Sequence, residues 1–369
     1  MSILALNSGS SSVKYGIFTS GAEVPPVRSS VDLDKGAGES ARGRAIRKIV
    51  ESAMQSHTIE AIGHRVVHGG EAFRDPVRID TPVLERIRSL TPLAPLHNPA
   101  CVQGIETVLE SAPQLPQVAV FDTAYSAALP ESAWRYALPH ELADRYRIRR
   151  YGFHGISHQY VCAEAAALLQ SPLKGLKLIS LHLGNGASAA ASHGGRCVET
   201  SMGMTPLEGL VMGTRAGDLD PSILITLQRQ AGLSAEALDA MLNHDSGLLG
   251  LCGDYDMRAI RRRARNGDAD ARLAIDIFVH RIRKYVGAYA AVLGGLDALI
   301  FTGGIGEHDT ELRAEVCNGL AFLGLHIDVR RNAGKLPLIS AGERPPHLLV
   351  IPTNEELAIA RATQACLGV

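Results

Sequence analysis

The chain has 369 residues, a length for which two domains are the default expectation. Apolar residues make up 46% and charged residues 20%, a globular balance with ample material for a core. The formal net charge is −1, so the chain lacks the basic excess that would attract nucleic acid or an anionic membrane surface.

The cysteines form no CxxC pair, which argues against a zinc site and is typical of free thiols in a reducing cytosol. They are Cys101, Cys162, Cys197, Cys252, Cys317 and Cys366. No basic and apolar leader precedes the first predicted strand, and no uninterrupted apolar run reaches membrane-spanning length. We therefore expect a soluble cytoplasmic protein whose partners include neither nucleic acid nor a membrane.

Short apolar strands alternate with helical patterns along the chain, which is typical of α/β architecture. The first predicted strand, Ile3–Leu6, runs into a turn of an amide, hydroxyls and a glycine at Asn7–Ser12, and Lys14 follows. These groups suit phosphate and a hydrated magnesium ion. The proline-, serine- and glycine-rich stretch from residue 24 to residue 43 is expected to form a hairpin connection or a loop.

Two further predicted strands carry charged residues. The strand within Ile62–Gly70 contains Arg65, for which a structural ion pair is the ordinary explanation because an unpaired buried guanidinium is costly. The strand Val118–Phe121 is followed by Asp122. Ligands of open α/β sheets bind outside the carboxyl ends of strands, so the position of Asp122 favours a functional role.

Two histidines lie in constrained turns. His97 is flanked by Pro95 and Pro99, which fix the backbone and suit either a rigid turn or the orientation of a ligand. His154 lies between Gly152 and Gly155, in a turn that feeds a helix. A lone histidine is more often structural than catalytic, so the residue type alone assigns neither one a role.

Two glycine-rich turns, His182–Gly186 and Gly303–Glu307, each follow an apolar strand-like run. Without a Cβ in the way, backbone N–H groups in such turns can approach a phosphate closely. Two turns of this kind, far apart in sequence, indicate two walls of one nucleotide site. The clearest helical pattern, Leu273–Leu293, leads towards the second turn, and a last helix is expected after Asn354, its N-cap.

Arg215 lies in a glycine-flanked loop that could bring it close to a ligand. Arg65 and Arg215 together suit a small carboxylate and a phosphoryl group, because the planar guanidinium matches both anions. No GxxxxGK[ST] pattern is present, so the phosphate site is not of the P-loop type. Taken together, the turns and the arginines indicate phosphoryl transfer.

Five segments resemble the signatures of the acetate kinase family, in family order along nearly the whole chain. They are Asn7–Lys14, Gly63–Gly70, Tyr151–Gly155, Ser201–Gly209 and Pro352–Glu356. That family belongs to the actin-like superfamily. The resemblance implies an α/β fold of two actin-like, ribonuclease H-like domains with a nucleotide cleft between them. The expected domains are residues 1–125 with 357–369, and residues 126–356, the larger of which would join a homodimer.

The resemblance further implies reversible transfer of the ATP γ-phosphoryl group to acetate, giving acetyl phosphate and ADP by direct in-line attack. Mg²⁺, or Mn²⁺ in its place, would be bound by Asn7 and Glu355, with Glu356 the neighbour most easily confused with Glu355. The remaining roles also follow from the resemblance. The catalytic residues would be Asp122, His154 and Arg215. Those that bind the acyl substrate would be Arg65, Val67, Leu96, His97, Phe153 and Pro206, of which Val67, Leu96, Phe153 and Pro206 would line the pocket for the methyl group. Those that bind the nucleotide would be Lys14, His182, Leu183, Gly184, Asn185, Gly186, Asp256, Met257, Arg258, Gly304, Ile305, Gly306, Glu307 and His308.

Two alternatives remain open. A propionate kinase would differ only in the volume of its acyl pocket, and one methylene is worth only about 1–3 kcal/mol of discrimination. A non-catalytic actin-like regulator would bind a nucleotide but no acyl substrate. Such a protein needs no carboxylate clamp, so the presence of Arg65, Asp122, His154 and Arg215 together argues against it.

Overall fold

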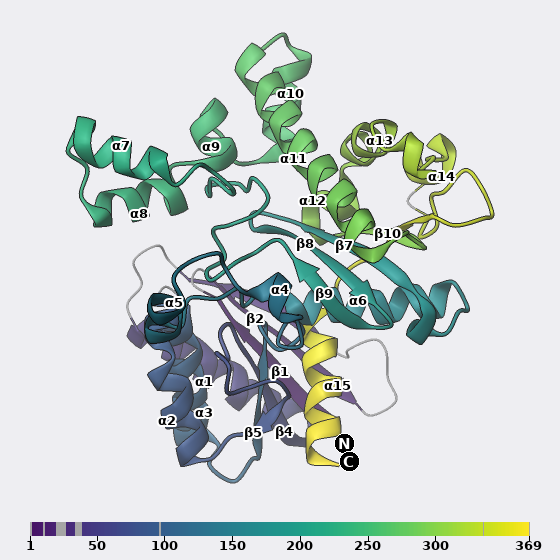
Figure 1. The fold of residues 1–369 in the computed structure, drawn as a ribbon. Coiled ribbons are helices and arrows are strands. Elements are labelled where there is room, and N and C mark those ends of the chain that lie inside the picture. Colours follow the sequence, from purple (N-terminus) through teal and green to yellow (C-terminus); the bar gives the residue numbers. More distant parts are fainter. Residues whose placement is uncertain are drawn as a thin grey trace. The chain divides into compact units, whose positions relative to one another are not determined.

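The computed structural model describes residues 2–9, 12–19, 27–33, 39–95, 97–334 and 336–368. The chain forms two compact units, each assembled from segments that are far apart in sequence. The first comprises Met1–Ala128, Phe153–Tyr160 and Asn354–Val369, and the second comprises Leu129–Gly152 and Val161–Thr353. Each unit contains its own mixed sheet and its own helices, so the expected α/β class is confirmed (Figure 1).

The first unit has a six-stranded sheet in the order β3-β2-β1-β4-β6-β5. Strands β1 to β3 pair antiparallel, β4 pairs parallel with both β1 and β6, and β5 closes the edge antiparallel to β6. The strands are β1 Ser2–Ser8, β2 Ser12–Thr19, β3 Val27–Asp32, β4 Ile59–Val66, β5 Val77–Arg78 and β6 Gln117–Phe121.

The stretch from residue 24 to residue 43 is not simply a connection, and that prediction was wrong over part of its length. Val27–Asp32 forms β3, and helix α1 begins at Glu39. The register places Ser29 opposite Tyr15 and Arg28 opposite Gly16, so the backbone of a polar segment completes the sheet edge. Backbone pairing does not require apolar side chains, which is why composition alone did not reveal this strand.

Helices cover both faces of the first sheet because the side chains of a strand alternate between the two faces. Leu4 and Leu6 of β1 pack in one cluster with Ile46 and Val50 of α1. On the other face, Ile3 and Ala5 pack in a second cluster that includes residues of α15. The helical segments of this unit are α1 Glu39–Ser56, α2 Thr81–Ser89, the 3₁₀ turn η1 Thr91–Leu93, α3 Asn98–Ser111, residues 155–160 of α6 (Gly155–Leu168) and α15 Glu355–Leu367.

The second unit has a five-stranded sheet in the order β11-β10-β7-β8-β9. Strand β10 pairs parallel with β7 and β11, whereas β7, β8 and β9 form an antiparallel meander. The strands are β7 Lys177–Leu183, β8 Ala187–His193, β9 Arg196–Thr200, β10 Ala298–Thr302 and β11 His347–Val350. The apolar runs that precede the two predicted glycine turns are therefore neighbouring parallel strands.

The long helix α11 covers Ala269–Leu293, four residues more than its apolar pattern predicted at the start. Asp268 caps it by accepting a hydrogen bond from the Ala271 N–H at 3.0 Å, and Gly294 ends it at φ 61°. The other helical segments of this unit are α4 Glu131–Trp134, α5 His140–Tyr146, residues 161–168 of α6, η2 Leu173–Gly175, α7 Ser222–Ala231, α8 Ala235–His244, α9 Gly247–Cys252, α10 Met257–Arg265, α12 Gly303–His308, α13 Thr310–Asn318, η3 Ala321–Leu323 and α14 Val329–Ala333. In the described ranges, no helix combines the length and the apolar character needed to cross a membrane.

Candidate active site

Arg65 and Asp122 form a bidentate ion pair at the carboxyl ends of two neighbouring parallel strands. Arg65 lies in β4, and Asp122 directly follows β6. The Arg65 Nε donates to both carboxylate oxygens of Asp122 at 3.0 and 3.1 Å, and Nη2 lies 2.5 Å from Oδ2. Burial by itself lowers the pKa of Arg65, but Asp122 and then Glu355 outweigh it and raise that pKa above its ordinary value. The guanidinium is therefore charged at any working pH.

Asn7 extends this pair into a chain of four side chains. Its Oδ1 accepts a hydrogen bond from Arg65 Nη1 at 3.0 Å, and its Nδ2 donates to Glu355 Oε2 at 3.0 Å. Asn7 stands at the end of β1, and Glu355 is the first residue of α15. Lys14, on β2, is directly opposite Asn7 in the antiparallel register and is exposed. Residues from both ends of the sequence therefore meet at the carboxyl end of β1, an inner strand of the first sheet.

Glu355 and Glu356 have different surroundings, which distinguishes the two adjacent carboxylates. Glu356 is 3% exposed and forms an ion pair of 3.0 Å with Arg28 of β3. Glu355 is only partly buried and contacts Asn7. Glu356 is thus a structural residue that joins α15 to the edge of the sheet, and Glu355 is the carboxylate directed towards the candidate site.

A metal ion would find few protein ligands at this place. The described residues contain no group of three or more histidine, cysteine or acidic side chains that could hold a metal. The Asn7 side-chain oxygen accepts from Arg65 Nη1, and Glu355 Oε2 accepts from Asn7, so Glu355 is the carboxylate at the end of this chain of contacts. This limited donor set fits Mg²⁺, which keeps several waters and is commonly held by one or two carboxylates together with substrate phosphates.

His154 occupies a left-handed turn that lies against Asp122. Its φ is 57°, an uncommon conformation outside glycine. The Gly155 N–H donates to the Asp122 carbonyl at 2.9 Å, and a Cβ on Gly155 would lie 2.1 Å from that carbonyl oxygen. Glycine is therefore required at 155 for the turn to approach Asp122. The sequence correctly placed His154 in a turn that feeds a helix, which is α6.

The predicted acyl-pocket residues Val67 and Phe153 are both buried in the first unit, at 5% and 2% exposure. The ring of His68, next to Val67, meets the Phe153 ring edge-on with 5.5 Å between centroids. Burial lowers the pKa of His68 to about 4, so this ring is neutral near pH 7. His97 is the N-cap residue of α3. Leu96 lies outside the described residues.

The two predicted nucleotide turns lie at adjacent strand ends in the second unit, where His182 pairs with Thr302. The first turn is closed by a hydrogen bond from the Gly184 N–H to the Gly186 carbonyl at 3.0 Å. The second is not only a turn, because Gly303–His308 forms the short helix α12 directly after β10. Gly303 starts that helix at φ 76°, where a Cβ would lie 2.7 Å from the Leu183 carbonyl oxygen.

Other nucleotide candidates have distinct environments. A Cβ on Gly304 would meet no described atom within 4 Å, so packing does not require glycine there. Glu307 Oε1 accepts hydrogen bonds from the N–H groups of Gly303 at 3.0 Å and Thr353 at 3.2 Å. It therefore joins α12 to the strand-end segment before Asn354.

The segment Asp256–Arg258 has three different environments. Asp256 caps α10 and accepts a hydrogen bond from the Arg258 N–H at 2.9 Å, while the Arg258 side chain is 85% exposed and pairs back to it. Met257 is only 4% exposed, so its backbone rather than its side chain is open to contact with a ligand.

Arg215 is partly buried and pairs with no carboxylate among the described residues. Its Nη1 donates to the Pro206 carbonyl at 2.8 Å and lies 3.6 Å from the sulfur of Met212. Burial lowers the pKa of Arg215 because no anion offsets the lost hydration. A guanidinium in these surroundings is suited to bind an anion supplied by a ligand.

Sequence reasoning missed two residues that support these elements. Asn98 is buried, and its side chain makes two hydrogen bonds with the backbone of His68. Its Oδ1 accepts from the His68 N–H at 3.0 Å, and its Nδ2 donates to the His68 carbonyl at 3.1 Å. Arg313 is fully buried and donates to the Gly306 carbonyl at 2.7 Å, at the end of α12. The available signals were an asparagine directly before Pro99 and one arginine at core-facing helical spacing from Val316.

The whole chain can be compared with known proteins. It matches the model of the acetokinase family over residues 27–361. It is 48% identical to an acetate kinase of Streptomyces avermitilis, over 99% of this chain and 97% of that protein. For an acetate kinase of Syntrophobacter fumaroxidans the identity is 47%, over 98% of this chain and 96% of that one.

Solved structures agree with these relatives. The crystal structure of acetate kinase from Porphyromonas gingivalis is 38% identical, and that of a propionate kinase from Francisella tularensis is 41% identical. Each has a TM-score of 0.91, and each alignment covers 99% of both chains. Similarity of this extent, in sequence and in structure, places the protein in the acetokinase family.

Proposed function

We propose that this protein is an acetate kinase that transfers the γ-phosphoryl group of ATP to acetate, giving acetyl phosphate and ADP, and that it catalyses the reverse reaction. The observation that carries the proposal is Arg215, a partly buried guanidinium with no carboxylate partner among the described residues. Such a cation is costly in a folded protein unless a ligand brings the anion. A transferring phosphoryl group, in a chain of this family, is the anion that fits.

Arg65 is the proposed acetate-binding residue. Asp122 and Asn7 engage its Nε, its Nη1 and one side of its Nη2, and the side chain remains 17% exposed. A guanidinium has five N–H donors, so donors on both terminal nitrogens remain for a carboxylate. Acetate is already ionised at neutral pH and needs no base. Both oxygens of Asp122 face Arg65, which supports a role for Asp122 in orienting the guanidinium rather than in proton transfer.

Phosphoryl transfer has a loose transition state whose charge spreads over the equatorial oxygens, so cations and N–H donors supply most of the catalysis. We assign this stabilisation to Arg215 and His154. Lys14 and the turns at residues 182–186 and 303–308 are the proposed contacts to the nucleotide, with Asp256–Arg258 on the adenosine side. Mg²⁺, or Mn²⁺ in its place, would be held by Glu355 with Asn7 beside it and would neutralise phosphate charge when bound.

The test is an acyl-phosphate assay with ATP, magnesium and either acetate, propionate or butyrate, in which hydroxylamine traps the product as a hydroxamate. We expect acetyl hydroxamate, ADP in equal amount, and ATP from acetyl phosphate and ADP in the reverse direction. Arg215→Ala is the matched variant and should lose kcat with little change in the KM for ATP, because its interaction forms chiefly in the transition state. Absence of activity with all three acids would refute the kinase proposal.

A propionate kinase is the second candidate, favoured by the 41% identity to the Francisella tularensis propionate kinase. The ratio of kcat/KM for acetate to that for propionate decides between the two, and a ratio below one would select propionate. The family resemblance also motivates a homodimer and a cytoplasmic location. A monomer mass by light scattering at micromolar concentration would contradict the dimer.

A further inference from the structure

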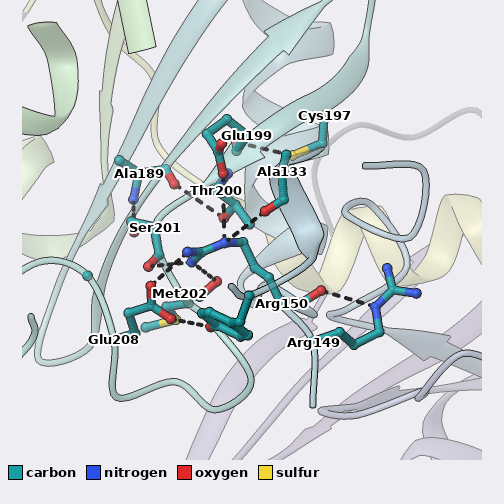
Figure 2. Close-up of polar contacts among 12 residues, drawn as sticks. Ala133, Arg149, Arg150, Ala189, Cys197, Glu199, Thr200, Ser201, Met202 and Glu208 are labelled. Carbon is teal, nitrogen blue, oxygen red and sulfur yellow. Dashed lines mark hydrogen bonds and ion pairs between the residues drawn. The ribbon is translucent and has the colours of Figure 1, made fainter. Parts of the chain in front are cut away.

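The guanidinium of Arg150 lies at the centre of a polar network in the second unit (Figure 2). Its Nη2 donates to Glu208 Oε1 at 2.7 Å, and its Nη1 reaches the carbonyls of Ser201 at 3.3 Å and Met202 at 3.2 Å. Its Nε donates to the Ala133 carbonyl at 3.3 Å. A single side chain therefore holds both ends of the segment Ser201–Gly209, which we call the 201–209 loop.

Tyr136 completes the network from the other side of Glu208. Its hydroxyl donates to Glu208 Oε2 and accepts a hydrogen bond from the Met204 N–H at 3.1 Å. The contact between Tyr136 and Glu208 requires glycine at 203, because a Cβ there would lie 1.8 Å from Glu208 Oε2 and 2.2 Å from the Tyr136 hydroxyl oxygen. The Tyr151 N–H also donates to the Gly203 carbonyl at 3.0 Å. The first half of the loop is thus fixed through backbone groups.

The far end of the loop is anchored to α11. The Gly209 N–H donates to Asp218 Oδ1 at 2.8 Å, and the Tyr285 hydroxyl donates to Asp218 Oδ2 at 2.8 Å. Arg281 of the same helix lies 3.2 Å from that carboxylate oxygen. Gly209 has φ 110°, and a Cβ there would lie 2.6 Å from the Ser201 carbonyl oxygen, so the loop closes tightly on itself.

The middle of the loop presents one carbonyl to Arg215. The Pro206 carbonyl oxygen accepts a 2.8 Å hydrogen bond from Arg215 Nη1. Among the described residues, this is the hydrogen bond to an oxygen that orients the Arg215 guanidinium. The direction of Arg215 therefore depends on the position of residue 206. That position in turn depends on the contacts at residues 201–204, 208 and 209.

From this connection we infer that Arg150, Tyr136 and Glu208 are positioning residues, which set the orientation of Arg215 through the 201–209 loop. The inference rests on the proposed function, because it concerns the guanidinium assigned there to the phosphoryl group. Displacements of about 1 Å in a catalytic group can cost about a hundredfold in rate. Loss of the network should therefore lower kcat, although none of its three members is among the residues assigned above to the acyl substrate or the nucleotide.

The experiment is a double-mutant cycle of Glu208→Gln and Arg215→Ala, with hydroxamate trapping so that long incubations keep low rates measurable. Glu208→Gln preserves the shape of the side chain and removes its charge. We expect it to lower kcat about tenfold or more, within the range of such positioning effects, and to leave the KM for ATP within about twofold. In the Arg215→Ala background it should cause no further loss, because residues that act through one group are not additive.

A purely structural role gives a different outcome. It predicts additive losses in the cycle, or a lower unfolding temperature with unchanged kcat, and either result would overturn the inference. If Glu208→Gln fails to fold, Tyr136→Phe replaces it in the same cycle, since only a hydroxyl is removed. The matched control is Glu315→Gln, which removes the charge that pairs with Arg261 at 2.9 Å and with Arg272 at 3.2 Å, in the same unit but outside the loop. This control should keep wild-type kcat.

The cycle also separates this inference from the proposed function. If Arg215→Ala loses activity while Glu208→Gln and Tyr136→Phe do not, the positioning role is wrong and the kinase proposal stands. If Arg215→Ala itself keeps wild-type kcat, the phosphoryl role of Arg215 fails, and the network has no catalytic group to position. A second readout is the acetate-to-propionate ratio of kcat/KM. Glu208→Gln should shift it, because the loop carries the proposed pocket residue Pro206, and Glu315→Gln should not.

Discussion

Adjacent glycines at the start of α12 allow the predicted nucleotide contact to be tested apart from the fold. Gly304 faces open space, because a Cβ there would meet no described atom within 4 Å. Gly303 has φ 76°, and its Cβ would lie 2.7 Å from the Leu183 carbonyl oxygen and 2.9 Å from the Leu183 nitrogen. Replacement by alanine should therefore affect stability differently at these two neighbouring glycines.

Gly304→Ala should leave the free energy of unfolding unchanged or raise it by up to about 1 kcal/mol, because alanine is the better helix former. Gly303→Ala should lower it by more than about 2 kcal/mol. The left-handed conformation alone costs about 1–2 kcal/mol for a residue with a Cβ, and the clash with Leu183 adds to this cost.

Gly304→Ala should weaken nucleotide binding, although it does not lower the free energy of unfolding. If the backbone there approaches a phosphate, the added methyl group obstructs that approach. A loss of about 1.4 kcal/mol would raise the Kd for ATP about tenfold. The measurements are urea unfolding without nucleotide, calorimetric titration with ATP and magnesium, and the KM for acetate as a control that should not change. Wild-type ATP affinity in a stable Gly304→Ala variant would refute the assignment of α12 to the nucleotide site.

Three further predictions concern the first unit. Arg65→Ala should raise the KM for acetate and lower kcat, and Arg65→Lys should restore neither fully because lysine lacks the bidentate fork; wild-type kinetics in both would leave Arg65 as a structural ion pair only. Val67→Ala should favour propionate by roughly fourfold in relative kcat/KM, since burying one more CH₂ is worth about 0.8 kcal/mol; an unchanged ratio would show that Val67 does not face the acyl group. Burial lowers the pKa of both His64 and His68 to about 4, so below pH 6.5 the unfolded chain binds protons that the folded chain does not, and stability is lost as the pH falls from 6.5 towards 4. Between pH 7 and pH 5 each histidine should reduce the free energy of unfolding by about 2 kcal/mol in denaturant titrations, and equal stability at both pH values would contradict their neutral burial.

Local sequence patterns predicted much of the secondary structure. The apolar runs at residues 178–181 and 298–302 form neighbouring strands, and the apolar spacing of residues 275–289 marks the buried face of α11. The same reasoning missed β3 and described α12 only as a turn. Both are elements whose stability comes from backbone pairing or from the end of a neighbouring strand, and neither has a strong apolar period of its own.

By itself, the sequence determined the α/β class, because the spacing of apolar residues differs between strands and helices. Its motifs carried the family resemblance that the comparisons confirmed. The tertiary structure alone decided which polar groups meet. Asn7 contacts Glu355 across 348 positions of sequence, and the ion pair of Glu356 with Arg28 separates it from its neighbour. Only packing revealed that Arg215 lacks a carboxylate partner among the described residues, because desolvation and pairing depend on three-dimensional surroundings that no local pattern encodes.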